Sequence, residues 1–266
     1  MSSNVNRLVI KIGSSTLTDA TGLLDVYYLQ TLAYQVANLH KRGIEVVIVT
    51  SAAIVAGLEA LDMPTTRPDD IPTLQAVAAV GQLKLVEQYS NAFNKHNIKL
   101  AQVLLTRNDT DNQESYLHIR DTLQRLLELG IVPLINENDT VAIDEIRFGD
   151  NDTLAARVAI LIDADLVILL SDIDGLYTAD PHLDQDAKLL EHIEEFTPEI
   201  INAAGDAGSK KGSGGMITKL EAAKMLMENN IPMVICEGHT ANAIIKAANG
   251  DNIGSRFFAE ERADRL

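Results

Sequence analysis

Apolar positions follow two alternating patterns along most of this chain. Short, continuously apolar runs predict strands that are covered on both faces, as in a parallel sheet. Between these runs, apolar residues recur three and four positions apart, which predicts helices with one buried face. The strand-like runs lie at residues 8–10, 44–50, 99–105, 131–135, 165–170, 232–236 and 254–259.

The helical patterns are bounded by residues that favour helix ends. Asp25 is a suitable N-cap for the first helix, and Gly43 ends it. The apolar residues on one face of that helix are Leu29, Leu32, Val36 and Leu39. A loop rich in Pro and Asp at 63–72 leads to a long helix that reaches about residue 95. Further helices are predicted at 113–129, 152–162, 217–229 and 241–248, and a short hairpin at 140–148.

The alternation of strands and helices predicts an α/β fold. The expected architecture is a three-layer α/β/α sandwich with a mostly parallel central sheet. No repeat or low-complexity linker interrupts the pattern, so residues 1–266 are expected to form a single domain, with a weak division near Ala164.

Composition and charge narrow the classes of function. With 46% hydrophobic residues the chain can bury a real core. It has no 18-residue apolar run and no apolar N-terminal segment, so we expect a soluble cytoplasmic protein without a membrane partner. The net charge of −16 argues against a nucleic-acid partner, which usually requires a basic surface.

The sequence predicts neither a cysteine nucleophile nor a histidine metal site. The single cysteine, Cys236, lies in the apolar run 232–236, where a buried thiol is a better interpretation than a nucleophile. The six histidines form no pair with ligand spacing, so no protein metal site is predicted.

Two glycine-containing clusters could hold phosphate. Residues 211–219 read K-G-S-G-G-M-I-T-K, where glycines allow backbone N–H groups to surround an anion, and Thr218 and Lys219 follow. This run differs from a Walker A loop, in which Gly and Lys are adjacent and Ser or Thr comes next. The second cluster, K-I-G-S-S at 11–15, ends the first predicted strand. A flexible connection and an ordinary strand-to-loop turn are the respective alternatives.

Three further polar clusters end or follow predicted elements in the first half. They are Thr50-Ser51, N-E-N-D at 136–139 and G-D-N-D at 149–152. Each could be a solvated turn or a helix cap. Ligands of parallel α/β sheets bind beyond the carboxyl ends of the strands, so together these clusters predict a site for a small amino acid.

These motifs, with V-T-S-A-A-I at 49–54, F-G-D-N-D at 148–152 and S-D-I-D-G-L-Y-T-A-D-P at 171–181, resemble the amino-acid kinase superfamily. The resemblance covers residues 8–258 and is most specific to the glutamate 5-kinase family. It implies ATP-dependent phosphorylation of the side-chain carboxylate of L-glutamate to glutamyl 5-phosphate, the first step of proline biosynthesis. It also implies that residues 1–163 bind glutamate, that residues 164–266 bind ATP, and that the protein forms a homo-oligomer.

The resemblance also assigns expected roles to residues. The catalytic residues would be Lys11 and Lys219, with Asp152 orienting both. The glutamate-binding residues would be Ser51, Asp139 and Asn151, with Asp150 and Asn136 as neighbours. The ATP-binding residues would be Lys11, Ser171, Asp172, Ser213, Gly214, Gly215, Met216, Ile217, Thr218 and Lys219. Mg²⁺ would be bridged by the ATP phosphates, with no protein ligand assigned to it.

The chain departs from the family pattern at three places. Ala52 stands where the family usually has Gly, which would interfere with a backbone that requires φ > 0. Lys210-Lys211 replaces a small neutral stretch, and no C-terminal PUA domain is expected after the last strand. Two alternatives stay open: a kinase for another small acid such as N-acetylglutamate, and a non-catalytic nucleotide-binding regulatory or storage protein. Asp139 and Asp150 argue against the first, and the retained Lys11, Lys219 and Asp152 against the second.

Overall fold

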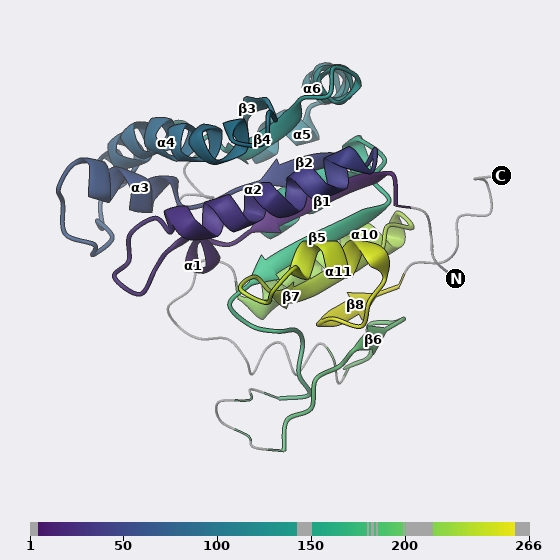
Figure 1. Ribbon diagram of the computed structural model, residues 1–266. Coiled ribbons are helices and arrows are strands. Elements are labelled where there is room, and N and C mark those ends of the chain that lie inside the picture. Colours follow the sequence, from purple (N-terminus) through teal and green to yellow (C-terminus); the bar gives the residue numbers. More distant parts are fainter. Residues whose placement is uncertain are drawn as a thin grey trace.

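A single eight-stranded sheet forms the centre of the computed structural model, which describes residues 5–142, 151–179, 181, 184, 186–198, 200 and 215–258. The strand order is β3-β4-β2-β1-β5-β7-β8-β6 (Figure 1). The paired strands are parallel except β7 and β8, which are antiparallel. The strands are β1 (Arg7–Ile12), β2 (Glu45–Val49), β3 (Leu100–Leu105), β4 (Val132–Glu137), β5 (Leu166–Ser171), β6 (His192–Ile193), β7 (Met233–Glu237) and β8 (Ser255–Phe257).

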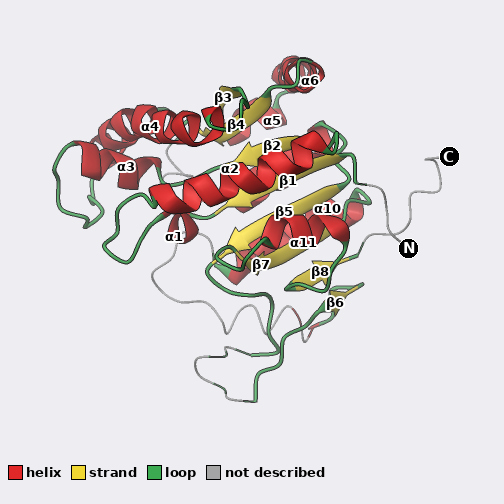
Figure 2. Ribbon diagram, viewed as in Figure 1, coloured by secondary structure: helices red, strands yellow, loops and turns green. Residues whose placement is uncertain are grey.

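Helices cover both faces of the sheet (Figure 2). The longer ones are α2 (Val26–Lys41), α4 (Ile71–Asn94), α6 (Gln113–Glu128), α8 (Asn151–Leu161) and α10 (Met216–Glu228). The shorter ones are α1 (Ser14–Leu17), α3 (Ala53–Ala60), α5 (Arg107–Asp111) and α11 (Ala243–Asn249). One hydrophobic core lies between the sheet and α2, α3, α4 and α11, and the other lies between the sheet and α6, α8 and α10.

Alternate residues of the central strand divide between these two cores, as the strand period of two requires. Leu8, Ile10 and Ile12 of β1 face the first core, and Val9 faces the second. Burial on both faces explains why β1, β2 and β5 are largely apolar in sequence. The predicted α/β sandwich with a mostly parallel sheet is therefore confirmed.

Most predicted elements are present, with shifted ends and some additions. Asp25 is the N-cap of α2, and its side chain accepts a hydrogen bond of 2.8 Å from the Tyr28 backbone N–H. The sequence predicted that the strand ends at residue 135 and that Asn136 follows it. β4 instead extends to Glu137, so Asn136 lies within the strand. The sequence patterns did not predict α1, α3, α5 or β6, which are short and have too few residues to show a period. The predicted hairpin at 140–148 lies largely outside the described residues.

Helices α3 and α4 pack unusually closely. A Cβ added at Gly81 of α4 would collide with the backbone of α3 at Ala53 and Gly57, and one added at Gly57 would collide with the carbonyl of Val77. Only glycine permits this approach of two backbones. The contact brings α4 against the start of α3, directly after the end of β2.

No helix in the described part of the chain is both long and apolar enough to cross a membrane.

Candidate active site

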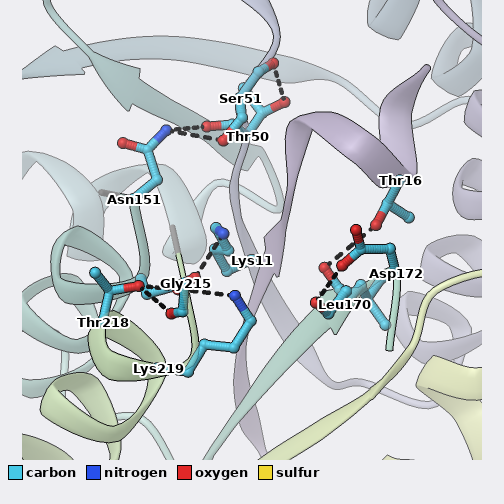
Figure 3. A network of polar contacts seen from close by, with 12 residues as sticks. Lys11, Thr16, Thr50, Ser51, Asn151, Leu170, Asp172, Gly215, Thr218 and Lys219 are labelled. Atoms are coloured by element: carbon cyan, nitrogen blue, oxygen red, sulfur yellow. Dashed lines mark hydrogen bonds and ion pairs between the residues drawn. The ribbon is translucent and has the colours of Figure 1, made fainter. Parts of the chain in front are cut away.

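Three charged side chains from distant parts of the chain meet beyond the carboxyl ends of the parallel strands. Lys11 is on β1, Asp152 is in the first turn of α8, and Lys219 is in the first turn of α10. The Lys11 Nζ lies 2.5 Å from one carboxylate oxygen of Asp152, and the Lys219 Nζ lies 3.2 Å from the other (Figure 3). We call these three residues the charged cluster.

The charged cluster is almost completely shielded from water. Asp152 is 1% exposed, and both lysines are 6% exposed. Burial by itself raises the pKa of the Asp152 carboxyl, but the two ammonium groups and the Thr218 hydroxyl outweigh it and lower that pKa to about 2. Asp152 is thus ionised at neutral pH, and two cations beside one anion leave the cluster with an excess positive charge.

The start of α10 adjoins this cluster. The Thr218 hydroxyl lies 2.9 Å from Asp152 Oδ2 and 2.9 Å from the carbonyl oxygen of Gly215, the N-cap residue of α10. Among the residues that the structure describes, none lies within 4 Å of the position where a Cβ of Gly215 would be. Open space at the N-terminus of a 13-residue helix, next to two lysines, suits an anion.

A second group of side chains is neutral and lies at the ends of β2 and β4. The Asn151 side-chain amide donates to the Thr50 carbonyl at 2.6 Å, to Asn136 Oδ1 at 2.9 Å and to Ser51 Oγ at 3.1 Å. Figure 3 shows Asn151 facing Thr50 and Ser51. We call Thr50, Ser51, Asn136 and Asn151 the amide cluster. An amide nitrogen has two hydrogens for these three acceptors, so one contact, such as that to Ser51, can be exchanged for a ligand.

Two buried residues of α4 support the amide cluster and were not found by sequence reasoning. The Asn136 amide donates to Gln82 Oε1 at 2.8 Å, and the Tyr89 hydroxyl lies 2.8 Å from the Thr50 hydroxyl. Gln82 is 9% exposed and Tyr89 is fully buried. A polar residue on the apolar face of the predicted helix was the signal that could have identified Gln82.

Asp139 lies three residues after Asn136 in sequence and has a different electrostatic environment. Burial raises the pKa of its carboxyl to about 6, although the positive charge of Arg67 acts in the opposite direction. In the part of the chain that the structure describes, the hydrogen bonds of the amide cluster do not include Asp139. Asp139 is therefore a separate acidic group, and its ionised carboxylate suits a cationic ligand.

Ala52 adopts a left-handed backbone conformation with φ > 0, the case in which Ala is expected to be less suitable than Gly. Its φ is 73° and its ψ is 17°, at the N-cap of α3. An L-residue other than glycine is strained by ~1–2 kcal/mol in this region. Its methyl group is buried in the first hydrophobic core, which partly offsets that strain.

The other predicted nucleotide residues lie at the end of β5 and the start of α10. The Ser171 hydroxyl donates to the Asp172 carboxylate at 3.1 Å. The loop that follows is anchored by the buried Ser255 hydroxyl, which accepts a 2.7 Å hydrogen bond from the Leu176 N–H. In the first turn of α10, Met216 is buried and Ile217 is 52% exposed.

Some predicted residues lie outside the described part of the chain: Asp150, Ser213, Gly214, Lys210 and Lys211. Cys236 is described, and its position confirms the prediction of a buried strand thiol. Burial raises the pKa of that thiol to about 12, which keeps it protonated and unreactive at neutral pH.

Comparison with known proteins identifies the family. The model of the Amino acid kinase family matches residues 6–237. A protein of Thermoanaerobacter sp. (strain X514) named glutamate 5-kinase is 48% identical over 252 residues, which are 95% of this chain and 68% of that protein. A Clostridium acetobutylicum protein of the same name is 47% identical over 260 residues, 98% of this chain and 97% of its own length.

A solved structure supports the fold independently. The UMP kinase of Bacillus anthracis superposes with a TM-score of 0.64 over 97% of this chain and 98% of its own, at 14% sequence identity. At that identity the likeness shows the fold alone. The resemblance predicted from the motifs is confirmed by the family match and the relatives, and the chain belongs to the amino acid kinase family.

Proposed function

We propose that this protein catalyses ATP-dependent phosphorylation of the side-chain carboxylate of L-glutamate, giving L-glutamyl 5-phosphate. The observation that carries the proposal is the burial of Asp152 between Lys11 and Lys219 at the carboxyl edge of the sheet. The close relatives named glutamate 5-kinase support the choice of substrate. The amide cluster and Asp139 lie where an amino-acid acceptor would bind.

The charged cluster fits the central difficulty of the reaction, which is to bring two anions together. As the bond from the acceptor carboxylate oxygen to the γ-phosphorus forms, the bond from that phosphorus to the ADP oxygen breaks. Lys11 and Lys219 would stabilise the negative charge of the transferring group, and Asp152 would hold both ammonium groups in place. Their excess positive charge is shielded from water. Electrostatic interactions are stronger in such a buried site than in bulk water.

The acceptor needs no general base. A glutamate side chain has a pKa of about 4.3, so it is already ionised at pH 7. Asp152, with its pKa of about 2, would be a poor proton acceptor in any case. The role of the site is therefore positioning: Ser51 and Asn151 would bind the substrate carboxylates, with Asn136 as the neighbour that orients Asn151, and Asp139 and Asp150 would bind the ammonium group.

The nucleotide would bind beside the charged cluster, in contact with Ser171, Asp172 and residues 213–219. The open N-terminus of α10 and the Thr218 hydroxyl fit the β- and γ-phosphates. Mg²⁺, when bound by those phosphates, supplies neutralisation of their charge. We assign acceptor binding to residues 1–163 and nucleotide binding to residues 164–266. On the family resemblance we also place the enzyme in the cytoplasm as a homo-oligomer active in proline biosynthesis.

The test is formation of acyl phosphate, trapped as hydroxamate with hydroxylamine, in the presence of ATP and Mg²⁺. Glutamate, aspartate, N-acetylglutamate and no acceptor are compared. Hydroxamate with glutamate alone is the expected result. A signal with N-acetylglutamate instead would overturn the assigned substrate, and ATP binding without any hydroxamate would overturn the proposed reaction.

A further inference from the structure

Gln82 lies behind the amide cluster, on the buried face of α4, and none of the family motifs includes it. We propose that Gln82 is a positioning residue for the acceptor: its carboxamide holds the Asn136 side chain in the direction that the neighbouring Asn151 amide requires. The inference rests on the proposed function, because it assigns Gln82 to the site where glutamate would bind.

One backbone carbonyl sets the direction of three side-chain amides. The Thr50 carbonyl can only accept, so the Asn151 atom 2.6 Å from it is the nitrogen. That nitrogen also lies 2.9 Å from Asn136, which must therefore turn its oxygen toward Asn151. The Asn136 nitrogen then points toward Gln82, whose oxygen accepts at 2.8 Å.

The direction of this chain determines what a ligand meets. Because the Asn151 nitrogen is used by protein acceptors, its carbonyl oxygen points away from Thr50 and Ser51 (Figure 3). Asn136 is held at both ends, by Asn151 and by Gln82. Without Gln82, the Asn136 amide would lose the contact that occupies its nitrogen. It could then rotate and place a donor where Asn151 requires an acceptor.

The glycine contact between α3 and α4 brings Gln82 into reach. Gly81 immediately precedes Gln82 and allows α4 to pack against the backbone of α3. Asn136 belongs to β4, and it is 54 residues from Gln82 in sequence. A side chain on a rigid helix, such as Gln82, is suited to hold an amide at a strand end in a precise position.

The side-chain nitrogen of Gln82 indicates that this residue has a role beyond packing. Its Nε2 is buried and has no hydrogen-bond partner among the described residues. An unpaired buried donor is unfavourable, so an apolar side chain of similar size would be better at this position if packing were its only role. The contact from Gln82 Oε1 to Asn136 is the one benefit of a carboxamide in the described structure.

The experiment is a double-mutant cycle of Gln82→Met and Asn136→Ala, measured in the hydroxamate assay. In the otherwise wild-type protein, Gln82→Met is expected to raise KM for glutamate about tenfold, while kcat and KM for ATP change about twofold or less. In the Asn136→Ala background the same substitution should change KM for glutamate by less than about twofold, because Gln82 acts through Asn136.

A matched control and a second variant exclude a general disturbance of α4. Leu85→Met changes a fully buried neighbour on the same helix without a polar contact, and it should leave both KM values unchanged. Gln82→Leu replaces Gln82→Met if the latter fails to fold, as monitored by thermal unfolding.

Three results would overturn the proposal: no rise in KM for glutamate, an equal rise in both backgrounds, or equal losses for glutamate and ATP. The wild-type protein separates this outcome from failure of the proposed function. If wild type forms no hydroxamate from glutamate, the assigned reaction is wrong, and the positioning role of Gln82 falls with it.

Discussion

The charged cluster and the amide cluster lie side by side, because Asn151 and Asp152 are consecutive residues in the first turn of α8. One is built from two ammonium groups and a carboxylate, and the other from neutral amides, a hydroxyl and a carbonyl. Charges act through space and suit the neutralisation of a transferring phosphoryl group. Amides act through directed hydrogen bonds and suit the placement of an acceptor.

The difference teaches what each cluster requires from the fold. The charged cluster depends most on Asp152, because removal of its carboxylate leaves two buried ammonium groups without a counter-charge. The amide cluster needs orientation, since a rotated amide exchanges a donor for an acceptor without changing its shape. Substitutions in the first should therefore affect stability and turnover together, and those in the second mainly affinity for the acceptor.

The largest effect is expected for Asp152→Asn. This substitution leaves the Lys11 and Lys219 ammonium groups buried without their carboxylate, so the free energy of unfolding should fall by ~3–5 kcal/mol. Turnover should fall by a factor of about 10³ or more, because both lysines lose their position. Urea unfolding and the hydroxamate assay measure the two effects. Unchanged stability would contradict the role of Asp152 as the counter-charge of both lysines.

Lys219→Ala should cause the next largest loss. Asp152 keeps its 2.5 Å contact with Lys11, so the protein should fold, with only a moderate loss of stability. The loss of one cation at the transferring group should lower kcat by about 10²–10³ with KM for glutamate little changed. Steady-state kinetics with each substrate varied check this split. Near-normal kcat in a folded variant would remove Lys219 from the reaction.

A tenfold effect, confined to glutamate, is expected at Asp139. Because the pKa of Asp139 is about 6, its carboxylate becomes ionised as pH rises through this value, and the ionised form binds an ammonium group. KM for glutamate should therefore fall between pH 5 and pH 8. Asp139→Asn should raise KM at pH 8 by about tenfold and remove the pH dependence, while KM for ATP stays within about twofold.

The same substitution has an opposite effect on stability, which provides a control. The raised pKa means that the folded protein holds the Asp139 proton more tightly than the unfolded chain does. The contribution of this group to stability is present below its ordinary pKa of 3.8 and is lost as pH rises through about 6. Asp139→Asn should therefore be more stable than wild type at pH 7, and this advantage should disappear near pH 4. Equal stability at both pH values would contradict the raised pKa.

The smallest effect is expected for Ala52→Gly. Glycine relieves the strain at φ 73°, but it removes a buried methyl group and adds flexibility to the unfolded chain. The relief of strain, ~1–2 kcal/mol, opposes two losses of about 1 kcal/mol or less each, so stability should change by about 1 kcal/mol or less. KM for glutamate should change about threefold at most.

Ala52→Val is the matched contrast, since a β-branched residue is rarely tolerated at positive φ. It should destabilise the protein by ~2 kcal/mol or more, as measured by urea unfolding. If the Gly and Val variants were equally stable, the left-handed backbone conformation of residue 52 would be contradicted.

The sequence by itself determined the order of strands and long helices along the chain, the mostly parallel character of the sheet, and the family. Short apolar runs rich in Val and Ile, such as the one within 44–50, favour strands that are buried on both faces. The residues proposed for the reaction stood out through their motifs. Short elements such as α3 did not, since eight residues that are nearly all apolar show no helical period.

Only the tertiary structure decided which of these residues meet and in what state. Lys11, Asp152 and Lys219 are far apart in sequence, and their contacts depend on where β1 ends and where α8 and α10 begin along one edge of the sheet. The role of Gln82 was likewise invisible, because it depends on the close packing of α3 and α4 and on a contact across 54 residues. Burial, pKa and the direction of an amide belong to the assembled environment, and no local pattern of residues contains them.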